Sequence, residues 1–157
     1  MRGRALMWGP RRPNKEKNDA AIELFEQALK VDPNESDALA GLALAYGRSE
    51  AWKWSGSNTD YVDKILPLSE RAIEIDPNNV TAYIARAYHL GFNGRWNDII
   101  RAANAGLAID PNSAALLAAR GYAEGKVGRY EERTSDREKA KRSNRDNPDP
   151  DMPWFDW

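Results

Sequence analysis

The residues that could perform nucleophilic or acid–base chemistry are few in this sequence. His89 is the only histidine, and the chain contains no cysteine. A catalytic histidine pair, a multi-histidine metal site and a thiolate site each need residues that this composition does not supply. His89 also falls inside a segment that we expect to be helical, where a packing role is the commonest one. The sequence therefore predicts a protein that is not an enzyme and that carries neither a metal site nor a cofactor.

Two further patterns could suggest chemistry, but both have a simpler structural explanation. The carboxylates lie beside Lys or Arg at helical spacing, which is typical of solvated helix faces. The stretches Gly91–Gly94 and Gly125–Gly128 resemble phosphate-binding loops in composition, but no strand precedes either of them. We expect both glycine stretches to be turns at helix ends.

Composition and charge restrict the class of partner. The chain has 157 residues, 41% of them hydrophobic, and a net charge of −1 at pH 7. This charge provides no overall attraction to nucleic acid or to an anionic membrane. The basic N-terminal residues match no nucleic-acid motif, and no apolar run reaches the length of a membrane span or a signal peptide. We expect a cytoplasmic protein whose partner is neither nucleic acid nor membrane.

An internal repeat defines the elements of the chain. The related stretches are ALKVDPN at 28–34, AIEIDPN at 72–78 and GLAIDPN at 106–112. Their last two prolines, Pro77 and Pro111, are 34 residues apart, whereas Pro33 and Pro77 are 44 apart. The longer interval indicates an insertion of about ten residues, as insertions between repeat elements commonly do.

Each repeat predicts a helix end followed by a new helix. The residue before proline is disfavoured in a helix, so helices should end near Val31, Ile75 and Ile109. Polar residues that commonly cap helix N-termini follow, and we expect this role for Ser36, Asn79 and Ser113. The helices that follow are predicted over Asp37–Arg48, Thr81–Phe92 and Ala114–Lys126. No segment alternates apolar and polar residues as a strand does, so the predicted fold class is all-α.

The most complete unit, residues 80–111, resembles the tetratricopeptide repeat (TPR). Its matching positions are Tyr83, Ala87, Leu90, Gly94, Trp96, Ile99, Ala103, Gly106, Leu107 and Pro111. The resemblance extends over residues 17–132 and implies a superhelix of stacked antiparallel helix pairs. It also implies a non-catalytic role in binding a protein or peptide in the concave groove. The stretch from Arg2 to Leu29 resembles, less closely, the TPR regions that follow nucleotide-cyclase or winged-helix regulatory domains in some soil bacteria.

In TPR proteins the first helix of each pair lines the groove, so the resemblance implies a set of groove residues. They are Asp37, Leu44, Arg48, Thr81, Ile84, Tyr88, Phe92, Tyr122 and Lys126. The aromatic residues among them either contact a partner or pack against the next repeat. Some TPR proteins clamp an acidic peptide terminus with lysines and asparagines on these helix faces. In this sequence Ala40, Leu44 and Ile84 occupy those positions. We therefore expect a partner with hydrophobic anchors.

The remaining segments depart from the repeat. We expect an incomplete first helix and a basic linker at 1–16, the array at 17–132 with its insertion at 49–59, and a polar capping helix followed by an extended tail at 133–157. The tail, rich in proline and aromatic residues, could instead begin another repeat. Trp52 and Trp54 in the insertion either cover the array or contact a partner. Both chain ends favour a piece of a longer protein, and self-association through exposed terminal repeats is the alternative function.

Overall fold

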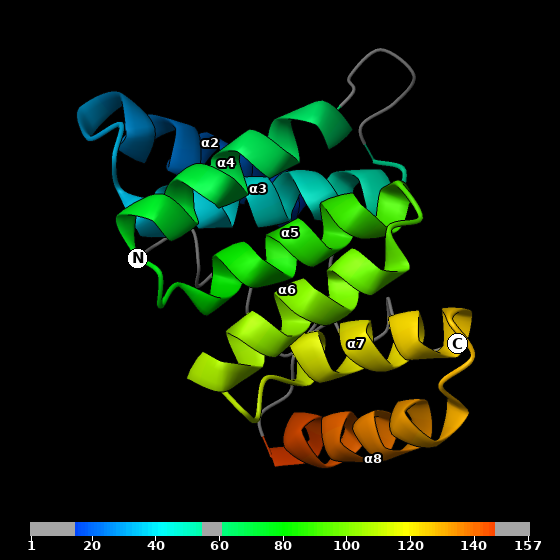
Figure 1. The fold of residues 1–157 in the computed structure, drawn as a ribbon. Coiled ribbons are helices and arrows are strands. Elements are labelled where there is room, and N and C mark those ends of the chain that lie inside the picture. The colour runs from blue at the N-terminus through cyan, green and yellow to red at the C-terminus, as the bar shows by residue number, and fades with distance from the viewer. Residues whose placement is uncertain (1–14, 55–60, 147–157) are drawn as a thin grey trace.

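The computed structural model describes residues 15–54 and 61–146, and within them every regular element is an α-helix (Figure 1). The helices stack one beside the next from α2 to α8, and each runs antiparallel to its neighbour in sequence (Figure 1). Their bounds are α2 Lys15–Val31, α3 Ser36–Ala51, α4 Val62–Ile75, α5 Val80–Phe92, α6 Trp96–Ile109, α7 Ala114–Lys126 and α8 Tyr130–Asp146. The all-α prediction is confirmed.

The helix ends follow the repeated Asp-Pro motif. Helices α2, α4 and α6 end at Val31, Ile75 and Ile109, as the sequence predicts. In the second and third copies of the motif, the side chains of Asn79 and Ser113 accept hydrogen bonds from the amides of residues 82 and 116. Both predicted N-caps are confirmed.

The third predicted N-cap, Ser36, is wrong. Glu35 caps α3, because its carboxylate accepts a hydrogen bond of 2.5 Å from the amide of Ala38. Glu35 is also the residue that follows Pro33 by two positions, as Asn79 follows Pro77. Ser36 is the first residue of α3, and its hydroxyl donates instead to the carbonyl of Ala72 in α4. The backbone of the turn therefore fixes the cap position, even where a stronger capping residue type stands next to it.

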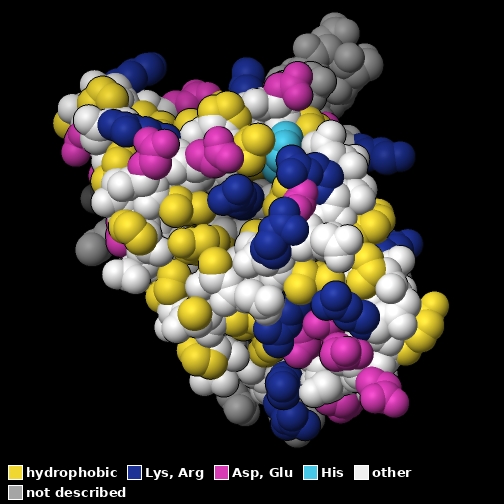
Figure 2. Space-filling view, in the orientation of Figure 1, with side chains coloured by type: hydrophobic (Ala, Val, Ile, Leu, Met, Phe, Trp, Pro, Cys, Tyr) yellow, Lys and Arg dark blue, Asp and Glu magenta, His cyan; other side chains and the backbone are white. Residues whose placement is uncertain are grey.

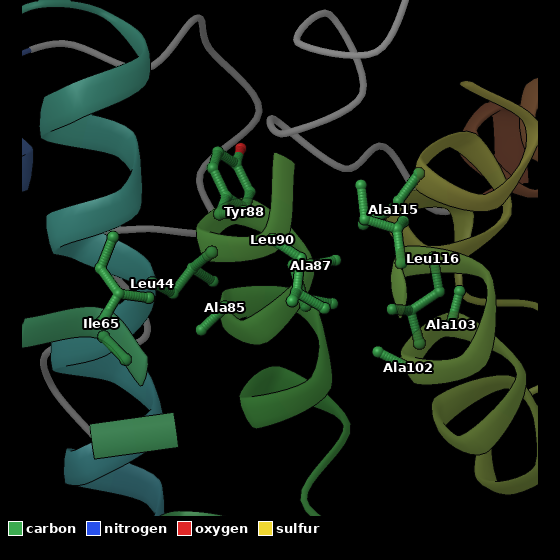
Figure 3. Close-up of a cluster of buried hydrophobic side chains, with 14 of the residues drawn as sticks. Leu44, Ile65, Ala85, Ala87, Tyr88, Leu90, Ala102, Ala103, Ala115 and Leu116 are labelled. Carbon is green, nitrogen blue, oxygen red and sulfur yellow. The ribbon is translucent and has the colours of Figure 1, made fainter. Parts of the chain in front are cut away.

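A continuous apolar core joins the helices. Figure 3 shows Leu44 and Ile65 facing Ala85 of α5, with Ala103 and Leu116 on the other side of that helix. These residues are almost completely shielded from solvent. Because each helix pair covers an apolar face of the next pair, the stability of one pair depends on its neighbours.

Small residues allow helices to approach closely at their crossings. A Cβ atom at Gly106 would lie 2.4 Å from Leu116 Cδ1, and one at Gly41 would lie 2.3 Å from the ring of Phe25. Both positions therefore require glycine for the observed packing. Gly94 and Gly128 have φ values of +65° and +85° and end their helices in the left-handed region. The prediction that the glycine stretches are helix-end turns is confirmed.

Helices α3, α5 and α7 are the first members of three pairs, and α4, α6 and α8 are the second members. Helix α5 contacts both α3 and α7, so the first helices share one side of the stack. Helix α2 packs on α3, and α8 packs on α7 at the other end. This arrangement places the predicted groove residues on three alternate helices, α3, α5 and α7, of which α5 contacts the other two.

The predicted domain limits extend beyond what the structure describes. The predicted first helix, most of the insertion and the tail fall on residues 1–14, 55–60 and 147–157, which lie outside the described residues. Helix α3 continues to Ala51, past its predicted end at Arg48. Helix α8 is mostly polar, and most of its described side chains are exposed.

Candidate binding surface

The predicted groove residues lie along the first helices of the three pairs. We call this set, together with the helices that carry it, the inner face. Helix α3 carries Asp37, Leu44 and Arg48, and α5 carries Thr81, Ile84, Tyr88 and Phe92. Helix α7 carries Tyr122 and Lys126. The inner face therefore spans three adjacent helices.

The part of the inner face on α3 and α5 is closed to solvent. Leu44 and Tyr88 are 0% exposed and Arg48 is 2% exposed, while Thr81 and Ile84 are also buried. Tyr88 packs against Gly47 of α3, where an added Cβ would lie 3.1 Å from the tyrosine. Its ring centroid is 6.4 Å from that of Phe92. Leu44, Ile84 and Tyr88 thus belong to the hydrophobic core in this structure.

The N-terminal ends of α3 and α5 are joined by a polar network. The side-chain amide of Asn79 donates to Ser36 Oγ at 2.9 Å and to Asp37 Oδ1 at 3.1 Å. Asn79 itself is 5% exposed. Because Asp37 accepts this hydrogen bond, it contributes to the packing of α3 against α5 as well as to the rim of the inner face.

The C-terminal end of α7 is the open part of the inner face. Tyr122 is half-buried and Lys126 is exposed. The Lys126 ammonium lies 5.0 Å from the ring centroid of Tyr122 and 5.8 Å from that of Trp96, and the two rings meet edge to face. A lysine held over two rings presents a positive charge in a fixed place.

A hollow of about 570 Å³ adjoins this lysine. Its lining residues are Tyr122, Gly125, Lys126, Tyr130 and Arg133. Gly125 leaves space there, since an added Cβ would lie 2.7 Å from the Arg133 side chain. The hollow combines aromatic surface with two positive charges, a combination that suits a ligand with aromatic and acidic groups.

Sequence reasoning missed Trp96, Tyr130 and Arg133 as members of this end of the surface. Trp96 and Tyr130 begin the second helices of their pairs, which the groove prediction does not include. Both residues follow a Gly-Arg dipeptide. That shared position after the turn is the only sequence signal that could have placed them together.

Trp52 and Trp54 follow the end of α3 and stack on each other. Their ring centroids are 6.0 Å apart at an angle of 16°, and the Trp54 amide donates to the carbonyl of Ser49 at 2.7 Å. Trp52 is 41% exposed and Trp54 is half-buried. The pair is therefore both partly packed and partly accessible.

The groups considered for chemistry have structural contacts. The His89 ring nitrogen Nδ1 lies 3.0 Å from the carbonyl oxygen of Val62, which links α5 to α4. In residues 15–54 and 61–146, no three His, Asp or Glu side chains converge as a metal site requires. Positive and negative side chains alternate over the face shown in Figure 2, without a field of one sign. Among the described helices, none has the length and apolar character needed to cross a membrane.

Helix α8 is attached to the array by a partly buried charge cluster. Arg120 of α7 donates to both carboxylate oxygens of Asp136 in α8, at 2.5 and 2.9 Å, and to Asn104 of α6 at 2.7 Å. The hydrogen bonds to Asp136 raise the pKa of Arg120. Burial raises the pKa of the neighbouring Glu124, and the negative charge of Asp136 adds to this effect. The cluster holds three helices in register.

Comparison with known proteins places this fold. The structure described as MamA MSR-1 C2 aligns over 82% of this chain and 68% of its own, with 22% identity and a TM-score of 0.59. MamA AMB-1 P212121 aligns over 82% and 70%, with 23% identity and a TM-score of 0.60. TTC0263, a thermophilic TPR protein in Thermus thermophilus, aligns over 88% and 89%, with 17% identity and a TM-score of 0.52. No family model and no curated protein matches the sequence.

The architecture and the structural neighbours agree. In the described part of the chain, seven helices form stacked antiparallel pairs, and a solved TPR protein shares this arrangement along most of its length. The fold is therefore an all-α helical-repeat superhelix of the tetratricopeptide type. The fold predicted from the repeated motif is confirmed.

Proposed function

We propose that this chain is a non-catalytic protein–protein interaction module that binds a peptide or a partner domain along its inner face. The observation that carries the proposal is the open end of that face. There Lys126 is held over Tyr122 and Trp96 beside a hollow large enough for aromatic side chains. Tryptophan, tyrosine and arginine are enriched among the residues that contribute most to binding energy at protein interfaces, and Tyr122, Tyr130 and Arg133 line the hollow.

The proposed mode of binding is an extended segment that crosses the first helices. Phe92 and Tyr122 supply half-buried aromatic surface on α5 and α7. Aromatic side chains bind with a small loss of conformational entropy, and a tyrosine hydroxyl can orient a peptide backbone. Asp37 supplies a partly exposed charge on α3, and the Trp52–Trp54 pair adds aromatic surface past the end of that helix. In this proposal the partner contributes aromatic anchors with acidic groups beside them.

The proposal that the chain is non-catalytic rests on the surroundings of the titratable groups. His89 contacts a backbone carbonyl in a helix crossing, and Glu124 and Asp136 belong to the cluster that attaches α8. Acid–base catalysis requires a titratable group directed into a cleft beside a reacting atom. These groups are used in packing instead.

The test is a binding measurement with matched charge reversals. Peptides selected from a displayed random library on the immobilised wild-type chain are titrated in solution by fluorescence anisotropy. Tyr122→Ala and Lys126→Glu should each weaken the selected peptides by about 10- to 100-fold, the range expected for interface hot spots. Lys64→Glu is the control, because Lys64 also lies over two rings, those of Tyr46 and Tyr61, on another helix pair.

The outcomes are distinct. The control variant should bind the selected peptides within about twofold of wild type, in line with small effects away from an interface centre. If Tyr122→Ala and Lys126→Glu bind as tightly as wild type while remaining helical by circular dichroism, the assignment of the binding surface is wrong.

A further inference from the structure

The hollow beside Lys126 continues along α8. A second hollow of about 330 Å³ adjoins it, and the two share Tyr130 and Arg133. Its other described lining residues all belong to α8 and are Thr134, Arg137, Glu138 and Lys141. We call the two hollows together the α8 groove. The groove extends the open end of the inner face by about three turns of helix.

The α8 groove concentrates positive charge on a chain that has little net charge. Its cationic lining residues are Lys126, Arg133, Arg137 and Lys141, and its one carboxylate among the described lining residues is Glu138. Four cations against one carboxylate give the lining a net charge of +3, whereas the whole chain carries −1. Arg133 and Arg137 also have contacts within the protein, so the attraction comes from the summed charge and requires no unpaired group. A ligand of this groove should be acidic.

The lining disfavours two kinds of acidic partner. A partner helix needs an apolar stripe to pack against, and the α8 side of the groove presents mostly charged side chains. A nucleic-acid strand carries a charge on every phosphate, which Glu138 in the groove and the net charge of −1 both disfavour. A peptide in an extended conformation can place a neutral residue opposite Glu138 and its carboxylates elsewhere. An extended acidic peptide therefore suits this lining best.

The cations on α8 have a spacing that an extended peptide matches. Arg133, Arg137 and Lys141 are four residues apart within α8, so they follow one side of the helix at intervals of about 6 Å. Side chains on one face of an extended chain recur every second residue, at about 6.4–6.8 Å. Over two intervals the mismatch is about 1 Å, which the long Arg and Lys side chains accommodate. Acidic residues at alternate positions of the partner would therefore meet the three cations in turn.

We propose that the α8 groove binds an extended segment of the partner that carries acidic residues at alternate positions. An aromatic side chain of this segment enters the hollow lined by Tyr122 and Tyr130, and the carboxylates that follow it face Arg133, Arg137 and Lys141. This inference rests on the proposed function, because it assigns the continuation of a partner that is bound at the open end of the inner face.

The test compares synthetic peptides of equal composition on the full chain. The alternating peptide is TWTDTDTDT and the blocked peptide is TWTTTDDDT, and each is also made in the reversed sequence. Threonine favours an extended backbone, so the peptides differ in the spacing of their carboxylates. In fluorescence anisotropy at low ionic strength, the alternating peptide in its better direction should bind at least about fivefold more tightly than either blocked peptide.

Matched charge reversals test where the carboxylates bind. Lys141→Glu changes the groove, whereas Lys139→Glu changes an exposed residue of α8 that is not among the described lining residues. Lys141→Glu should weaken the alternating peptide about three- to tenfold, and Lys139→Glu by less than about twofold. Replacing the peptide aspartate farthest from the tryptophan with asparagine should reduce the effect of Lys141→Glu to less than about twofold. Circular dichroism checks that both variants remain helical.

The inference is overturned if the alternating and blocked peptides bind equally, if none of them binds, or if the two charge reversals have equal effects. Tighter binding of an alanine-rich helical peptide with aspartates four residues apart, or of oligothymidylate, would identify a different occupant and would also overturn it. If Tyr122→Ala and Lys126→Glu still weaken the library-selected peptides in these cases, the proposed function stands and the path along α8 is wrong. If those two variants have no effect, the proposed function itself fails.

Discussion

Replacing Asp136 with alanine should detach α8 from the array. Asp136 is 3% exposed and accepts two hydrogen bonds from Arg120. The substitution leaves the partly buried guanidinium with Asn104 and the more distant Glu124 carboxylate, 3.9 Å away, as its remaining partners. Removing one partner of a buried ion pair costs about 3–5 kcal/mol. The Arg120 side chain keeps 22% exposure, and water screens part of the charge that is left. We therefore expect a loss of about 2–3 kcal/mol.

The loss should be local, because α8 lies at one end of the described stack and packs mainly on α7. Ala140 is the buried apolar residue among the described side chains of α8, which is otherwise strongly polar. Burial of one alanine contributes on the order of 1 kcal/mol. Hydrogen exchange should therefore become fast in the amides of α8 and stay slow in α3 and α5. Urea unfolding followed by circular dichroism at 222 nm should show an early transition that corresponds to one helix.

Two further variants separate the charge from the shape of the contact. Asp136→Asn keeps an acceptor oxygen of similar size but loses the charge, so its cost should be about half that of Asp136→Ala. Combining Arg120→Met with Asp136→Ala should recover about 1–2 kcal/mol relative to the sum of the single losses. A cost below about 0.5 kcal/mol for Asp136→Ala, with protected α8 amides, would refute the assignment of this ion pair as the attachment of α8.

Four other substitutions test a helix crossing, a buried carboxylate and two helix caps. Gly106→Ala places a Cβ 2.4 Å from Leu116 Cδ1, so thermal unfolding should show a net destabilisation of about 1–3 kcal/mol despite the better helix propensity of alanine. Burial raises the pKa of Glu124, so the Glu124 carboxyl group binds a proton more tightly in the folded chain than in the unfolded chain. The free energy of unfolding therefore falls as pH rises above the ordinary glutamate pKa of about 4.3. Glu124→Gln should therefore increase stability at pH 7 and flatten urea-derived stability between about pH 4 and 7; a steeper profile would contradict the sign. Asn79→Ala should cost about 2 kcal/mol in urea unfolding, against about 1 kcal/mol for Ser113→Ala, because Asn79 caps α5 and also donates to α3.

The candidate surface was predicted in part. The helical-repeat resemblance led to Tyr122 and Lys126, which lie at the open end beside the hollow. It also led to Leu44 and Tyr88, which are core residues in the structure. Spacing along a helix identifies the side that faces inward. It does not show which inward positions are covered, because the covering groups come from distant parts of the chain.

The sequence by itself determined the repeat and the C-terminal ends of α2, α4 and α6. Proline disfavours the helical conformation in the residue before it, so each of the three repeated Asp-Pro motifs ends a helix independently of the tertiary structure. The 34-residue period and the glycine at 106 then required stacked pairs that approach closely. These are local constraints, and a single sequence states them directly.

Only the tertiary structure decided which side chains meet. Lys126 lies over Trp96, and Arg120 reaches both Asn104 and Asp136, because the superhelix brings α6, α7 and α8 side by side. Charges and rings of these types are common on helix surfaces, and no pattern in the sequence distinguishes those that pair from those that remain in solvent. Pairing depends on the distance between side chains across helices, and the packing of the whole array sets that distance.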